Sequence, residues 1–258
     1  MKREITEALL ASYSPISLAE MDEVRLMNRI DTKYTTSFCL LPEILKRLQS
    51  DYIVLEVNGS RSSAYRTMYL DTCDRAMYLD HHNGRKTRKK IRIRAYVDSR
   101  TIFLEIKNKN NKGRINKKRI ELPEMKAYKQ PKAETFIGMY AEYPLEVLMP
   151  QLENSFNRIT LVNREKTERV TIDVNLAFRN PTDGTEKQVD DLVIIEVKQT
   201  GFLPSIAKGV LSDMRIQPMR ISKYCLGTIL TAPDVKRNRF KEKLIKINKI
   251  REKAYGFV

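Results

Sequence analysis

Two arginines stand two positions apart in the segment KIRIRAYV, residues 90–97. Because side chains alternate between the two faces of a strand, Arg92 and Arg94 share one face, and the apolar residues between them take the other. Guanidinium groups placed side by side present planar sets of donors that match phosphate oxygens. The segment therefore predicts a strand with one phosphate-binding face.

The same alternation recurs in three other segments. One face carries Glu105, Lys107 and Lys109 in TIFLEIKNK, Arg169, Thr171, Asp173 and Asn175 in ERVTIDVNL, and Glu196 and Lys198 in DLVIIEVKQT. Any one of these alone is most simply a half-buried strand with its polar face in water. The repetition favours a polyphosphate ligand, because cations neutralise phosphate oxygens and a carboxylate can hold a divalent metal against them. A tunnel would bring such faces together.

Several familiar sites are excluded by their missing motifs. The chain has neither a G-x-x-x-x-G-K-[ST] loop nor a G-x-G-x-x-G turn, and no G-x-S-x-G elbow. Its two histidines, His81 and His82, are adjacent and do not share a helical face, so we expect a surface pair rather than a zinc site. Trp is absent, which weakens base-stacking modes of nucleic-acid binding.

Charge and cysteine content narrow the class of protein. A formal net charge of +16 concentrates polyanions, which leaves nucleic acid, an anionic membrane surface and phosphate compounds as candidate partners. The three cysteines are an odd number without a Cys-x-x-Cys pair, so a reducing compartment is indicated. No apolar run approaches the length of a membrane span. We expect a soluble, cytoplasmic protein.

The elements that must position these residues form an α+β pattern. Residues 3–50 are predicted to be mostly helical, with Ser17 as an N-cap and a helix opening at Pro42. From Tyr52 the period shifts towards two, and eight candidate strands follow at 52–57, 64–71, 90–97, 101–109, 115–122, 158–166, 168–178 and 191–200. Eight strands suffice for a small barrel, so the predicted fold is an antiparallel β-barrel tunnel with flanking helices.

Helices are predicted between and after these strands. They cover 72–82, an insertion at 132–152, 203–214 and 223–230. No repeat or Gly/Ser linker supports a boundary, so we expect one domain over 1–258 with a basic helical tail at 234–258. Phe240, Leu244 and Ile247 stand at helical spacing in that tail. Packing through this apolar stripe is the simpler expectation, and a membrane or polyanion anchor is the alternative.

Taken in order, these motifs resemble the VTC domain, a family of the triphosphate tunnel metalloenzymes. The resemblance covers roughly residues 20–230 and lies in the order of many short motifs: RIDTKY (29–34), TMYLDT (67–72), IRIRAY (91–96), FLEIKNK (103–109), NKKRIEL (116–122), LVNREKTERVTIDVNL (161–176), IIEVKQ (194–199) and ISKY (221–224). It implies an antiparallel β-tunnel whose inner wall binds a triphosphate or a growing polyphosphate chain.

The resemblance also implies roles for particular residues. The metal-binding glutamate of the family maps onto Glu196, which joins Arg92, Arg94 and Lys107 as catalytic residues. In NKKRIEL, Lys117 and Arg119 share one face and Lys118 the other, and we assign Lys118 to the wall. Tyr69 and Asp71 match positions that are either structural or in contact with substrate. The substrate-binding wall is assigned to Lys33, Arg92, Arg94, Lys107, Lys118, Arg164, Arg169, Lys198 and Lys223.

The activity implied by the resemblance is that of a polyphosphate polymerase. It would transfer the γ-phosphoryl group of ATP to phosphate or to a polyphosphate chain, with Mn²⁺ or Mg²⁺ as cofactor and no protein nucleophile. A metal-dependent triphosphatase of the same tunnel class and a non-catalytic polyphosphate-binding module are the alternatives. Other nucleoside triphosphates are possible substrates, and no specific nucleic acid is expected. Coupling to membrane transport would need a separate membrane protein.

Overall fold

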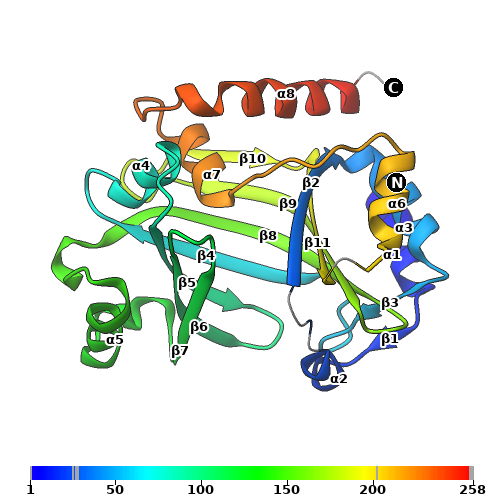
Figure 1. Ribbon diagram of the computed structural model, residues 1–258, viewed down its shortest axis with the longest axis horizontal. Helices are drawn as coiled ribbons and strands as arrows, with labels where there is room; N and C mark the ends of the chain where they lie inside the picture. The colour runs from blue at the N-terminus through cyan, green and yellow to red at the C-terminus, as the bar shows by residue number, and fades with distance from the viewer. Residues whose placement is uncertain (1, 25, 27–28, 202, 256–258) are drawn as a thin grey trace.

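The computed structural model describes residues 2–24, 26, 29–201 and 203–255. One strongly curved sheet dominates it, with its strands in the spatial order β2-β11-β9-β8-β4-β5-β6-β7 (Figure 1). Every neighbouring pair along this path is antiparallel. The path comprises β2 (Arg29–Ser37), β11 (Leu192–Thr200), β9 (Glu168–Arg179), β8 (Met149–Asn163), β4 (Ser63–Asp71), β5 (Arg88–Tyr96), β6 (Thr101–Lys109) and β7 (Ile115–Leu122).

Three short strands extend the sheet off this path. Strand β3 (Tyr52–Leu55) pairs with β8 and, in parallel, with β1 (Pro15–Ile16), and β10 (Glu186–Val189) pairs with β9. Strands β2 and β7 stand at the two ends of the path, so the sheet curls into a barrel-like form without closing on itself. The predicted fold class, α+β with an antiparallel tunnel-like sheet of about eight strands, is confirmed.

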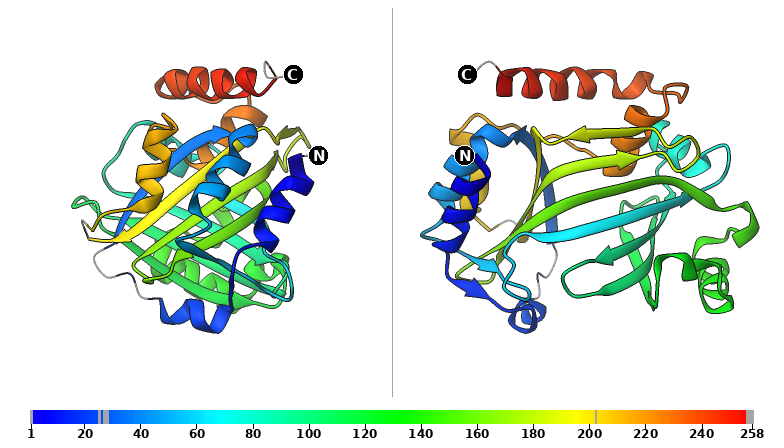
Figure 2. Two further views of the ribbon diagram at one scale, coloured as in Figure 1. Left: turned by 90° about the vertical axis from the view of Figure 1, so that its right-hand side faces the viewer. Right: turned by 180° about the vertical axis from the view of Figure 1, so that it is seen from behind.

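Helices cover the outer face of the sheet in two groups (Figure 2). At one end α1 (Lys2–Ala11), α3 (Leu41–Leu48) and α6 (Ile206–Asp213) enclose the apolar side chains of β8, β9 and β11. At the other end α5 (Pro131–Ala141) and the 3₁₀ helix η2 (Met125–Lys129) bury those of β5 and β6. Because the apolar side chains of these strands all point outwards into these two cores, their charged side chains face inwards.

Helix α7 (Lys223–Thr231) closes one end of the inner face. Its Tyr224 stacks on Tyr69 with ring centroids 4.9 Å apart. Gly227 approaches β8 and β9 so closely that a Cβ there would lie 2.4 Å from the Phe178 ring. The chain reaches α7 by running along the free edge of β2, where the Met219 amide donates to the Lys33 carbonyl at 2.8 Å.

The remaining elements lie at the periphery. Helix α2 (Leu18–Glu23) begins at the predicted N-cap Ser17, which forms a capping box with Glu20. Helices α4 (Ala76–His82) and α8 (Lys241–Tyr255) flank α7, and Phe240 and Ile247 of the C-terminal segment are buried as the apolar stripe predicts. The short 3₁₀ helices are η1 (Phe38–Leu40), η3 (Leu145–Val147) and η4 (Asn238–Phe240). No helix of the described chain is both long and apolar enough to cross a membrane.

Three local predictions were wrong. Residues 29–37 form strand β2 rather than helix, and their alternating charged residues were the overlooked signal of period two. The predicted helical insertion ends with α5 and η3, because β8 already begins at Met149 and pairs with β4. His82 is only 2% exposed instead of lying on the surface, since its ring packs against Phe240.

Candidate functional site

Three carboxylates on the inner face each contact two cations. Glu196 of β11 pairs with Lys33 of the neighbouring strand β2 and with Lys198 two residues along its own strand. The two lysines take one carboxylate oxygen each. Because lysine side chains are long and rotate freely, this is the most easily rearranged of the three groups.

The second group lies across the middle of β5, β6 and β7. The Glu105 carboxylate is fully buried and accepts from the Arg92 guanidinium, with Nε at 2.6 Å. Lys117 contacts the other oxygen as an ion pair without hydrogen-bond geometry. These cations hold the pKa of Glu105 down to about 2 against the raising effect of burial.

The third group joins β8, β9 and the start of α7. The Arg158 guanidinium donates to both oxygens of Asp173, at 2.6 and 2.9 Å, and Lys223 contacts the same carboxylate. Burial alone would raise the pKa of Asp173, but the two cations lower it well below its ordinary value. A forked contact of this kind fixes the guanidinium plane.

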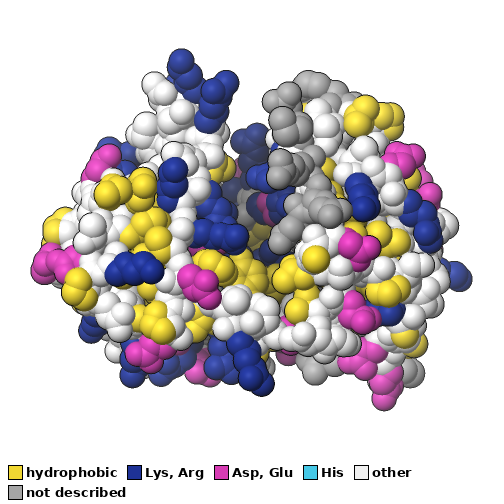
Figure 3. Space-filling view, turned by 90° about the horizontal axis from the view of Figure 1, so that it is seen from below, with side chains coloured by type: hydrophobic (Ala, Val, Ile, Leu, Met, Phe, Trp, Pro, Cys, Tyr) yellow, Lys and Arg dark blue, Asp and Glu magenta, His cyan; other side chains and the backbone are white. Residues whose placement is uncertain are grey.

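Other cations of the inner face have no carboxylate partner among the described residues. Arg94 donates to the Thr67 hydroxyl at 3.2 Å and lies over the Tyr65 and Phe156 rings. Lys90 and Lys107 face each other as a cross-strand pair on β5 and β6. Figure 3 shows Lys and Arg side chains gathered in the hollow between the β5–β7 side and the β2 side.

The pKa values of the inner lysines record this shortage of negative charge. Burial and the nearby Arg92 and Lys90 lower the pKa of Lys107 to about 6. Burial lowers that of Lys223 to about 7, although Asp173 opposes the shift. Buried cations without counter-ions are unfavourable, so the face as it stands is suited to receive a polyanion.

Most of the predicted wall residues meet on this inner face. Cross-strand register and ion pairs bring together Lys33, Arg92, Arg94, Lys107, Arg169, Glu196, Lys198 and Lys223. Arg169 pairs across strands with Lys198, and burial together with Arg29 and Arg158 lowers its pKa.

Two predicted wall residues lie elsewhere. Lys118 pairs across strands with the outward Ile106, and its ammonium group lies 5.6 Å from the Tyr140 ring centroid on the outer face. Lys117 and Arg119 occupy the inward positions of that strand instead. Arg164 follows the end of β8 and donates to the Ser50 carbonyl at 2.8 Å, outside the hollow.

Other residues of the inner face escaped the sequence prediction of the site. Lys90, Lys117 and Arg158 were not assigned, and Glu105 and Asp173 were placed on the correct faces without a role. Alternation in RITLVNREK contained the signal for Arg158, but that strand was expected to begin at Arg158 itself, whereas it begins nine residues earlier.

Asp71 has a structural position. Its carboxylate accepts from the backbone amides of Thr72, Met77 and Tyr78 and from the Tyr224 hydroxyl. These contacts tie strand β4 to helices α4 and α7. Of the two alternatives for TMYLDT, the structural one agrees with the contacts of Asp71.

The donor set permits a divalent metal only in a particular form. Among the described residues no group of three His, Cys, Asp or Glu side chains converges. Mg²⁺ is commonly bound by one or two carboxylates together with substrate phosphates and water. Glu196 fits such a site, because its two partners are mobile lysines, whereas Asp173 is fixed by a forked arginine.

The comparisons with known proteins agree with this architecture. The family model of the VTC domain matches residues 28–231. The chain therefore belongs to the VTC domain family, as its ordered motifs predicted. No curated protein matched the chain.

Several solved structures are similar to this chain at low identity. A Vibrio parahaemolyticus protein described as a candidate adenylate cyclase is 10% identical, with a TM-score of 0.46 over 78% of this chain and 99% of its own. HpAC1 from Hippeastrum, described as having a dominant triphosphatase activity, is 11% identical, with a TM-score of 0.45 over 79% and 96%. A conserved hypothetical protein from Pyrococcus furiosus is 12% identical, with a TM-score of 0.41 over 77% and 99%.

Proposed function

We propose that this chain is a polyphosphate polymerase that transfers the γ-phosphoryl group of ATP to phosphate or to the end of a polyphosphate chain. The observation that carries the proposal is the inner face itself, where buried cations outnumber carboxylates and several have no counter-ion. A linear polyanion supplies that missing charge along several strands at once. Membership of the VTC domain family supports the same substrate class.

The residues of the face divide into positioning groups and binding groups. The carboxylates of Glu105 and Asp173 hold Arg92 and Arg158 in fixed orientations before substrate arrives. Guanidinium groups held in this way stabilise charge on a transferring phosphoryl group without reorganising. Arg94, fixed between two aromatic rings, and Lys107 remain to contact phosphate oxygens directly.

Phosphate chemistry also explains why the face needs no strong base. An acceptor phosphate is already ionised near neutral pH, so no protein group must remove a proton from it. Glu196 would hold a Mn²⁺ or Mg²⁺ ion, which when bound neutralises charge on the phosphate oxygens. Lys33 and Lys198, freed from Glu196, would then bind those oxygens themselves.

Product analysis tests this proposal. Purified protein is incubated with ATP and either Mn²⁺ or Mg²⁺, with and without added phosphate, and the products are separated on a urea gel stained for polyphosphate. A ladder of long chains is the expected result. Phosphate release without a ladder would identify a triphosphatase instead, and salt-dependent ATP binding without turnover would identify a binding module.

A further inference from the structure

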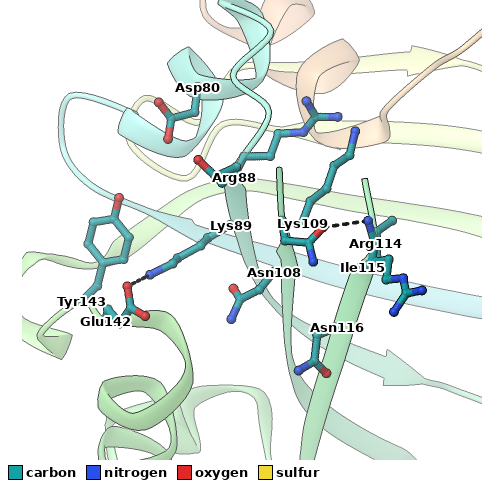
Figure 4. A pocket seen from close by; sticks show the side chains of 12 residues that line it. Asp80, Arg88, Lys89, Asn108, Lys109, Arg114, Ile115, Asn116, Glu142 and Tyr143 are labelled. Carbon is teal, nitrogen blue, oxygen red and sulfur yellow. Dashed lines mark hydrogen bonds and ion pairs between the residues drawn. The ribbon is translucent and has the colours of Figure 1, made fainter. Parts of the chain in front are cut away.

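A polar cleft of about 750 Å³ opens beside the inner face, at the end of the β6–β7 hairpin. Its walls come from β5, β6 and β7 and from the ends of α4 and α5 (Figure 4). Ligand pockets usually measure about 300–1,000 Å³, so a nucleoside fits this volume. None of the cleft residues belongs to the ion-pair groups described above.

The cleft continues the basic inner face. The pair Arg88–Lys109 lies one step beyond Lys90–Lys107 on the same face of β5 and β6. Two residues along a strand span about 7 Å, roughly the spacing of neighbouring phosphates plus a sugar linkage. A triphosphate bound by Lys90 and Lys107 therefore has its remaining end at the mouth of this cleft.

The lining of the cleft differs chemically from the tunnel wall. Asp80 and Glu142 stand at its rim, where Glu142 pairs with Lys89. Carboxylates repel a polyphosphate chain but accept hydrogen bonds from the hydroxyl groups of a ribose. The cleft is accordingly a poor exit for a polyanion and a good site for a neutral group rich in hydroxyls.

Amide side chains line the floor. Asn108 of β6 and Asn116 of β7 are cross-strand partners and lie side by side in Figure 4. Asn108 is anchored, since its Nδ2 donates to the Tyr140 carbonyl at 2.7 Å. The Asn116 amide is exposed and has no hydrogen-bond partner among the described residues. An Asn amide offers one donor face and one acceptor face, which match the amino group and ring nitrogen of adenine.

We propose that this cleft binds the nucleoside of the nucleoside triphosphate, with Asn116 hydrogen-bonded to an amino-bearing purine and Tyr143 providing a flat surface for the base. The inference rests on the proposed function, because it takes the triphosphate to lie on the inner face. It assigns nucleotide selectivity to residues outside the basic wall.

Comparison of ATP with tripolyphosphate, which has the phosphates but no nucleoside, tests the proposal. Dissociation constants are measured by calorimetry for the wild type, Asn116→Leu and Tyr143→Leu. Asn248→Leu, an exposed change on α8, is the matched control. We expect Asn116→Leu to weaken ATP binding about fivefold, the effect of one lost hydrogen bond, and to leave tripolyphosphate binding unchanged.

The outcomes separate this inference from the proposed function. If both cleft variants change ATP and tripolyphosphate affinity equally, or change neither, the cleft does not bind the nucleoside. If the wild type binds tripolyphosphate as tightly as ATP, the nucleoside site is refuted while the tunnel stands. If the wild type binds neither ligand, both proposals fail.

Discussion

Lys107 should take up a proton when the inner face receives a polyanion. Burial and the neighbouring cations lower its pKa to about 6, so the side chain is neutral in the free protein above that pH. Phosphate oxygens placed beside it favour the charged form and raise the pKa back towards its ordinary value of about 10.4. Binding between these two values therefore consumes a proton, and affinity rises as the pH falls through this range.

The size of the effect follows from the pKa. At pH 8 only about 1% of Lys107 carries a proton in the free protein, given a pKa of about 6. Nearly all of it does so in the complex. Replacing Lys107 by Met should therefore reduce the number of protons taken up by about one. The ionisation of the ligand itself cancels in the comparison, because the same ligand is used with both proteins.

Calorimetry in buffers of different ionisation enthalpy measures this number. ATP without metal is titrated into wild type and Lys107→Met at pH 8, and the slope of observed enthalpy against buffer enthalpy gives the protons exchanged. Lys118→Met is the control, because Lys118 lies on the outer face of the neighbouring strand. Equal slopes for wild type and Lys107→Met would refute the reasoning.

Three further predictions concern turnover and stability. Glu196→Gln should lower metal-dependent turnover at least about a hundredfold and leave metal-free ATP binding intact, because it removes a negative charge and frees two lysines; loss of binding in calorimetry would contradict this. Arg94→Met should lower kcat/KM by about 2–4 kcal/mol with an unchanged melting temperature, and unaltered kinetics would remove Arg94 from the site. Gly227→Ala should destabilise the fold by about 1–3 kcal/mol in urea unfolding, since its Cβ would lie 2.4 Å from Phe178 and 2.6 Å from Leu152; an unchanged midpoint would show that α7 shifts freely.

The sequence predicted which face of a strand a residue occupies better than which residue lies beside it. Alternation placed Arg92, Arg94 and Lys107 together correctly, because the side-chain period of a strand is two. It could not show that Glu105 lies between Arg92 and Lys117, since that arrangement depends on the register between strands.

The error at Lys118 has the same cause. Alternation set Lys117 and Arg119 against Lys118, but the sequence did not say which of the two faces is inward. The choice is made by Ile120 and Leu122, whose apolar side chains share the face of Lys118 and pack with α5 and η2. Strand β2 was missed because its sequence, RIDTKYTTS, follows a helical stretch and contains few apolar residues.

The central claim is that polyphosphate binds along the inner face of the curved sheet. A crystal structure of the protein with tripolyphosphate bound tests it most directly. The account predicts phosphate groups in contact with Lys107, Arg94 and Arg92, within hydrogen-bond distance of the guanidinium and ammonium groups. Phosphates bound only on the basic surface of α8, with the inner face empty, would contradict it.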